Sequence, residues 1–91
     1  MSKIVKTAVA GGVESGDCFV QVEPFAGKIE LELQSTLILQ FGDCIRETVL
    51  KTLEESDISE AKVTIDDHGA LDWILKARVQ TAIERAKEET V

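Results

Sequence analysis

The chain has 91 residues, a hydrophobic fraction of 44% and a formal net charge of -7. This length suits one folded core and is too short for two, so we expect a single domain over residues 1–91. An acidic surface repels phosphate backbones and anionic headgroups, which argues against nucleic-acid and membrane partners and favours basic patches on proteins.

The N-terminal part of the chain leads into a glycine-rich loop. Residues 1–10 place apolar side chains among lysines, and we expect either a short edge strand or a flexible arm. Residues 11–17, with the sequence GGVESGD, are acidic and rich in glycine, which allows backbone angles closed to other residues. They predict a loop that presents the hydroxyl of Ser15 to solvent.

Two strands with one buried and one wet face are predicted next, at residues 18–23 and 28–35. In both, every second side chain is apolar: Cys18, Val20, Val22, Ile29, Leu31 and Leu33. Pro24 ends the first strand, and residues 24–27 suit a chain reversal. We therefore expect the two strands to pair as an antiparallel hairpin.

A helix is predicted over about 36–55, capped by the hydroxyl of Ser35 or Thr36. Gly42 marks either a close contact inside this helix or a break, in which case the helix starts at Asp43. Its apolar residues recur every four positions, at Leu37, Phe41, Ile45, Val49 and Leu53. Residues 61–66 then form a third strand, with Val63 and Ile65 inward.

A second helix is predicted from about Ala70 to Lys87, with Asp67 or a neighbour as its cap. Because a helix joins the second and third strands, these strands should be parallel with a right-handed crossover. Each strand has one wet face, so both helices should cover the same side of the sheet. The predicted fold class is α+β: a two-layer sandwich of ferredoxin-like character, with a mixed three- to four-stranded sheet and two helices on one face.

The residues that could carry chemistry do not form a catalytic constellation. Ser15 is a candidate nucleophile and His68, the one histidine, a candidate base. However, Ser15 does not lie in the Gly-x-Ser-x-Gly motif of hydrolases, and His68 is better explained as a turn residue. One histidine among scattered acids makes no metal site, and the loop glycines lack a phosphate-loop ending. We expect neither catalytic residues nor a metal site.

Trp73 borders the apolar stripe formed by Leu71 and Ile74, which predicts a partly buried packing residue. The alternative is an anchor for a docking partner, because tryptophan is enriched at interface hot spots.

The two cysteines, Cys18 and Cys44, are expected to be small buried hydrophobes rather than reactive thiols. There is no Cys-x-x-Cys pair, no secretory leader and no run near the roughly 18 apolar residues of a membrane span. We therefore expect a cytoplasmic protein with reduced thiols.

Three stretches carry a combined pattern: AVAG at 8–11 leading to ESGD at 14–17, QFGD at 40–43 followed by Ile45 and Arg46, and DHGALD at 67–72 followed by Ile74-Leu75 and Ala77-Arg78. In order, spacing and total length they resemble the acyl carrier protein (gamma subunit) of citrate lyase. The chain departs from that family's pattern at Trp73, where a small residue is usual, and at His68, where lysine is common.

The resemblance implies a single acyl carrier domain in citrate fermentation that is not an enzyme by itself. Ser15, flanked by Glu14, Gly16 and Asp17, would carry 2'-(5''-phosphoribosyl)-3'-dephospho-CoA through a phosphodiester, making the chain a phosphoprotein. The thiol of this arm would hold acetyl, which the alpha subunit exchanges for citryl. The beta subunit would then cleave the citryl thioester to oxaloacetate. The other implied partners are a prosthetic-group transferase and an acetylating ligase.

Two alternatives stay open at this point. One is the analogous acyl carrier of a malonate decarboxylase complex, which uses a similar group. The other is a ferredoxin-like protein-interaction module without a cofactor.

Overall fold

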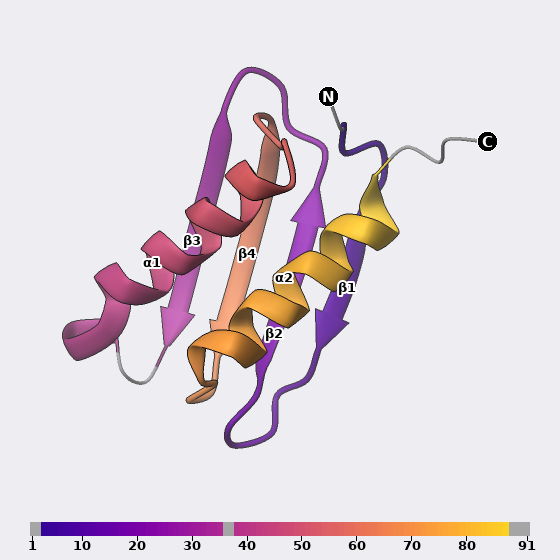
Figure 1. Ribbon diagram of the computed structural model, residues 1–91. Coiled ribbons are helices and arrows are strands. Elements are labelled where there is room, and N and C mark those ends of the chain that lie inside the picture. Colours follow the sequence, from indigo (N-terminus) through magenta and orange to yellow (C-terminus); the bar gives the residue numbers. More distant parts are fainter. Residues whose placement is uncertain (1–2, 36–37, 88–91) are drawn as a thin grey trace.

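The computed structural model describes residues 3–35 and 38–87, the side chains of residues 38–41 excepted (Figure 1). The elements follow in the order β1 (Ala8–Gly11), β2 (Cys18–Glu23), β3 (Ile29–Ser35), α1 (Ile38–Glu55), β4 (Ala61–Asp67) and α2 (Asp72–Ala86). The described strands form one mixed sheet of four, and both helices lie on the same face of it (Figure 1). The predicted fold class is confirmed.

The predicted hairpin of β2 and β3 is wrong, because β4 lies between these two strands in the order β1-β2-β4-β3. β4 pairs antiparallel with β2, with Val20 opposite Ile65, and parallel with β3, with Leu31 opposite Val63. β4 is the most buried strand, and Ala61, Val63 and Ile65 are fully buried. In the observed order the backbone of β4 is hydrogen-bonded along both edges, whereas beside a β2–β3 hairpin it would be an edge strand. The predicted parallel pairing across the helix is confirmed.

Residues 1–10 were expected to form an edge strand or a flexible arm, and the structure has a strand at their end, β1 (Ala8–Gly11). β1 pairs antiparallel with β2 at the sheet edge, with Ala10 opposite Val20. The backbone N–H groups of Val5 and Lys6 both donate to the Ala86 carbonyl, at 2.9 and 3.2 Å. Ile4 is only 3% exposed. The segment before β1 is thereby fixed to the end of α2.

The core lies between the sheet and the two helices. The predicted inward residues of β2 are fully buried, and so are the α2 residues Val79 and Ala82. α1 contributes the predicted stripe of Ile45, Val49 and Leu53. Leu37, which was predicted to continue that stripe, and Thr36, a predicted cap, lie outside the described residues, as does the side chain of Phe41.

The turn between β4 and α2 is held by Asp67, which does not cap the helix. Its Oδ1 accepts from the backbone N–H of Ala70 at 3.0 Å, and its Oδ2 accepts from the Ser35 hydroxyl at 2.9 Å. α2 begins only at Asp72, after Leu71, and has no side-chain cap hydrogen bond. The predicted Asp67 cap is wrong because the turn, with Gly69 at a φ of 91°, takes up the residues after the strand.

The two cysteines differ in exposure. Cys18 is fully buried as predicted, but Cys44 is exposed, so the burial predicted for it is wrong. Cys44 lies one helix position before the inward Ile45, which turns its side chain away from the core. Burial, together with the nearby carboxylates of Asp17 and Asp67, raises the pKa of the Cys18 thiol to about 11.

We therefore expect one thiol of the folded protein to react with iodoacetamide at neutral pH. Cys44 should be alkylated quickly, while Cys18 is shielded and protonated. Intact mass after a short exposure should show a single addition, and the Cys44→Ser variant should show none. Rapid addition to folded Cys44→Ser would contradict the burial of Cys18.

Candidate functional site

The four residues predicted to form the site, Glu14, Ser15, Gly16 and Asp17, make up one tight turn between β1 and β2. The backbone N–H of Asp17 donates to the Glu14 carbonyl at 3.0 Å. Gly16 has a φ of 86° in the third position of the turn, as a type II turn requires. Ser15 occupies the exposed second position. A Cβ atom built on Gly16 meets nothing within 4 Å, so the turn is uncrowded at the residue next to Ser15.

The backbone of His68 fixes this turn to the end of β4. The N–H of Gly16 donates to the His68 carbonyl at 2.7 Å, and the N–H of His68 donates to the Asp17 carbonyl at 2.9 Å. These bonds extend the β2–β4 ladder past its last pair. The imidazole Nε2 lies 3.2 Å from Asp66 Oδ2. His68 is the turn residue that the sequence predicts, and its backbone supports the serine turn.

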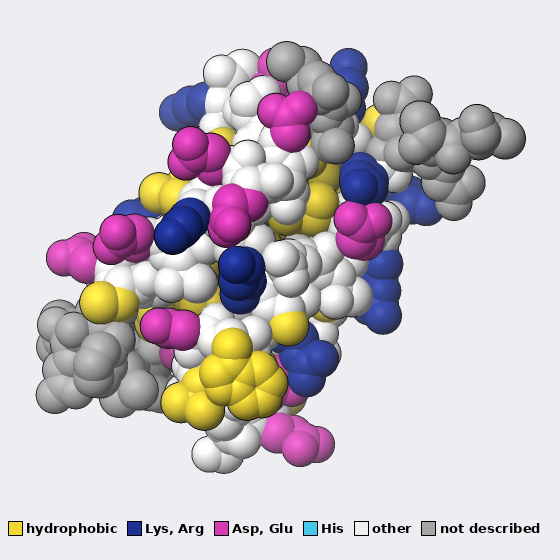
Figure 2. Space-filling view, in the orientation of Figure 1, with side chains coloured by type: hydrophobic (Ala, Val, Ile, Leu, Met, Phe, Trp, Pro, Cys, Tyr) yellow, Lys and Arg dark blue, Asp and Glu magenta, His cyan; other side chains and the backbone are white. Residues whose placement is uncertain are grey.

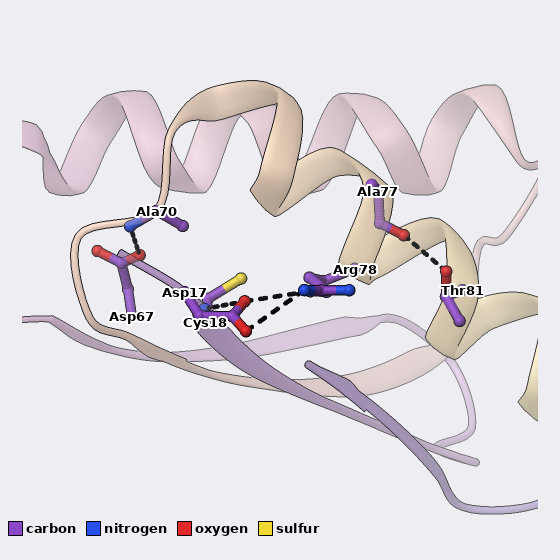
Figure 3. A network of polar contacts seen from close by, with 7 residues as sticks. All are labelled: Asp17, Cys18, Asp67, Ala70, Ala77, Arg78 and Thr81. Atoms are coloured by element: carbon purple, nitrogen blue, oxygen red, sulfur yellow. Dashed lines mark hydrogen bonds and ion pairs between the residues drawn. The ribbon is translucent and has the colours of Figure 1, made fainter. Parts of the chain in front are cut away.

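Arg78 of α2 holds the turn from the other side (Figure 3). Its Nε donates to Asp17 Oδ1 at 3.1 Å, and its Nη2 donates to Oδ2 at 3.3 Å. Oδ1 also accepts from the N–H of Cys18 at 2.7 Å. The hydrogen bond from Arg78 is the main cause that lowers the pKa of Asp17, and the same bond raises the pKa of Arg78.

The sequence patterns gave Arg78 no role in the site, although the structure places it against Asp17. The available signal was the Ala77-Arg78 pair at the end of the third matching stretch. Asp17 and Arg78 lie 61 positions apart, so a spacing pattern within one element does not reveal their contact.

We predict that Arg78→Ala raises the pKa of Asp17 toward its ordinary value. A lowered carboxyl pKa adds stability above the unfolded pKa, and that stability is lost as pH falls through the folded value. The stability difference between wild type and variant should therefore shrink on acidification below about pH 4. NMR titration of the Asp17 carboxyl measures the shift directly.

Arg85→Ala is the matched control, because Arg85 is another α2 arginine and donates to the Val9 carbonyl at 2.8 Å instead. It should leave the pKa of Asp17 unchanged. An unchanged Asp17 pKa in Arg78→Ala would contradict the assigned contact.

A surface hollow of about 370 Å³ opens between the turn and α2. We call it the Ser15 hollow, and it is lined by Glu14, Ser15, Gly16, Asp17, Trp73, Ile74, Ala77 and Arg78. Its volume lies within the roughly 300–1,000 Å³ typical of ligand sites. It thus joins the predicted site residues to the start of α2.

Trp73 is 69% exposed, so the predicted packing role is wrong. The inward stripe of α2 begins at Leu75, because Leu71 precedes the helix and is itself 60% exposed. Hydrophobic side chains gather over the first turn of α2 (Figure 2). A second hollow, the α1-side hollow, runs from Trp73 and Leu71 to Cys44 and Ile45 on α1 and has a volume of about 570 Å³.

This arrangement suits attachment of a group better than catalysis on a bound substrate. The serine hydroxyl is accessible, its turn is held by the backbone of β4 and by Arg78, and open space lies beside it. Among residues 3–35 and 38–87, no three histidine, cysteine or acidic side chains lie close enough to hold a metal ion. Within the same residues, no helix is long and apolar enough to cross a membrane.

The sequence of the chain matches one family of known proteins over almost its whole length. The acyl carrier family model described as malonate decarboxylase delta subunit matches residues 5–86. The chain is 49% identical over 86 residues to the citrate lyase acyl carrier protein of Cronobacter sakazakii, covering 94% of this chain and 89% of that protein. It is 51% identical to that of Vibrio cholerae, covering 92% and 87%. The corresponding protein of Treponema denticola is 44% identical, with 96% and 99% covered.

Among solved structures, a Pseudomonas malonate decarboxylase hetero-tetramer in complex with malonate contains a chain of the same fold. Its TM-score is 0.75 and its identity 21%, and the match covers 93% of each chain.

Proposed function

Because the chain belongs to the citrate lyase acyl carrier protein family, we propose that it serves a citrate lyase and that Ser15 bears its acyl-carrying arm. The chain is an acyl carrier subunit and not a catalyst by itself. The observation that carries the proposal for Ser15 is its exposed position in an open turn beside the Ser15 hollow.

The proposed arm is 2'-(5''-phosphoribosyl)-3'-dephospho-CoA in phosphodiester linkage to the Ser15 oxygen. When attached, it supplies a thiol that holds the acyl group as a thioester. The surroundings of Ser15 suit a large substituent, because Ser15 is exposed and a Cβ atom at the neighbouring Gly16 would meet nothing within 4 Å.

The other residues of the turn would support the arm without touching the reacting thioester. Asp17, paired with Arg78, keeps the root of the arm in one place while its far end moves. Glu14 is exposed at the rim and leaves an acidic surface beside the serine. Tethering of this kind raises the effective concentration of the acyl group at partner active sites.

The proposed partners are the alpha and beta subunits of citrate lyase, the transferase that attaches the arm and the ligase that acetylates its thiol. A net charge of -7 suits basic docking faces on these proteins. We propose a cytoplasmic location for the assembly.

A carrier of a malonate decarboxylase complex is the second candidate. The description of the matching family model favours it, and so does the fold shared with the Pseudomonas enzyme. The identities of 49% and 51% to citrate lyase carriers favour citrate lyase. A cofactor-free interaction module is the third candidate, and its fold would be the same.

Reconstitution distinguishes these candidates. Loaded and unloaded protein are each added to citrate lyase depleted of its carrier and, separately, to malonate decarboxylase depleted of its carrier. We expect only the loaded protein to restore oxaloacetate formation from citrate. Restored malonate decarboxylation alone would favour the second candidate, and restoration of either activity by unloaded protein would contradict the proposed arm.

A further inference from the structure

The position of Trp73 is not explained by packing. It is the single tryptophan of the chain, 69% of its surface is exposed, and it lies in the first turn of α2. It shares the outer face of the helix with the exposed residues Ala77, Gln80 and Glu84. Burial of the exposed indole against an occupant of this face would contribute favourable free energy.

The indole lines the same hollow as the proposed attachment point. Ser15 and Trp73 both contribute to the Ser15 hollow, although they lie on different elements. An occupant of the hollow need not arrive from solution, because a group attached to Ser15 is already beside Trp73.

The charges around the hollow restrict the chemistry of that occupant. The carboxylate of Asp17 is offset by Arg78, and Glu14 adds one further negative charge. The side chains lining the hollow therefore carry a net negative charge, which suits a neutral aromatic ring better than an anionic group. Indole faces stack well on such rings, and purines present a flat face whatever their hydrogen-bonding edge.

This step rests on the proposed function. In the proposed arm, the serine oxygen is followed by one phosphate, one ribose and then the ribose that bears adenine. The purine is therefore near the root of the arm, and the acyl-bearing thiol is at its far end. We propose that the adenine ring of the arm stacks on Trp73 in the Ser15 hollow and leaves the thiol end free to move.

Base–aromatic stacking favours the stacked over the unstacked state by roughly fivefold or more. The root of the arm would thus spend most of its time on the carrier. Fewer freely rotating bonds then separate the acyl group from the folded domain. The thiol therefore explores a smaller volume around the carrier.

The test uses full-length protein loaded by the transferase, with loading verified by intact mass before each measurement. Because Trp73 is the single tryptophan, indole emission reports on the surroundings of this one side chain. We expect emission in the loaded wild type to fall by roughly half or more relative to unloaded protein. The adenine protons should shift upfield in NMR spectra, and this shift should disappear in loaded Trp73→Leu and persist in Trp73→Phe.

Leu71→Ala is the matched control, because Leu71 is similarly exposed but lines the α1-side hollow and not the Ser15 hollow. It should keep the adenine shift. Equal adenine spectra in loaded wild type and Trp73→Leu would overturn the proposal. So would weaker assembly of Trp73→Leu with the lyase subunits at unchanged adenine shifts, since Trp73 would then be a protein-docking anchor. A protein that acquires no adduct under loading conditions would instead contradict the proposed function.

Discussion

Ser15→Ala is expected to abolish acyl carrier activity while leaving the fold intact. The substitution removes the oxygen to which the arm would be joined, so turnover in a reconstituted citrate lyase should fall to the background without carrier. Because Ser15 is exposed at a turn, the substitution should change the protein's free energy of unfolding by no more than about 0.5 kcal/mol. Citrate-dependent oxaloacetate formation and urea denaturation measure the two quantities.

Val13→Ala is the control for this substitution, because Val13 lies in the same loop and is 65% exposed. It should accept the arm and restore turnover. Measurable turnover with Ser15→Ala, above the background without carrier, would exclude this serine as the attachment point.

Gly11→Ala is expected to destabilise the protein by about 3 kcal/mol or more, a large share of the stability of a small domain. Gly11 has a φ of 91°, which is strained for alanine. A Cβ atom there would lie 1.9 Å from the backbone carbonyl oxygen of Cys18. That oxygen also accepts from the N–H of Gly12 at 3.0 Å, so relief of the clash disrupts the start of the serine loop.

Gly16→Ala is the comparison that measures the cost of the backbone strain without the clash. Gly16 has a similar φ of 86°, but its Cβ would meet nothing within 4 Å. Its expected loss is only about 1–2 kcal/mol, from the left-handed backbone alone. Urea denaturation of both variants makes the comparison, and equal losses would contradict the close approach of Gly11 to β2.

The repeating patterns of the sequence predict most of the elements, because alternation and helical stripes depend on local burial. The pairing of the strands depends on contacts between distant segments. β4 comes last among the strands yet lies between β2 and β3, and the turn signal at residues 24–27 suggested a hairpin that does not form. The parallel pairing of β3 with β4 could be predicted, because a helical connection constrains it.

The site was predicted in part. A glycine-rich acidic stretch indicates an exposed turn, and Ser15 is where that pattern puts it. The contact of Arg78 with Asp17 joins residues 61 positions apart, so the periodicity of a single helix or strand does not predict it. The exposure of Trp73 depends on where α2 begins. The helix was predicted to start at Ala70, which put Leu71 in its apolar stripe, but it starts at Asp72, after Leu71.

The most direct test of the central claim is the mass of the protein isolated from cells that express the transferase and the enzymes that make the arm. We predict an addition equal to one phosphoribosyl-dephospho-CoA group, located by fragmentation on Ser15 and lost in Ser15→Ala. An unmodified mass under these conditions, or an addition located on another residue, would contradict the account.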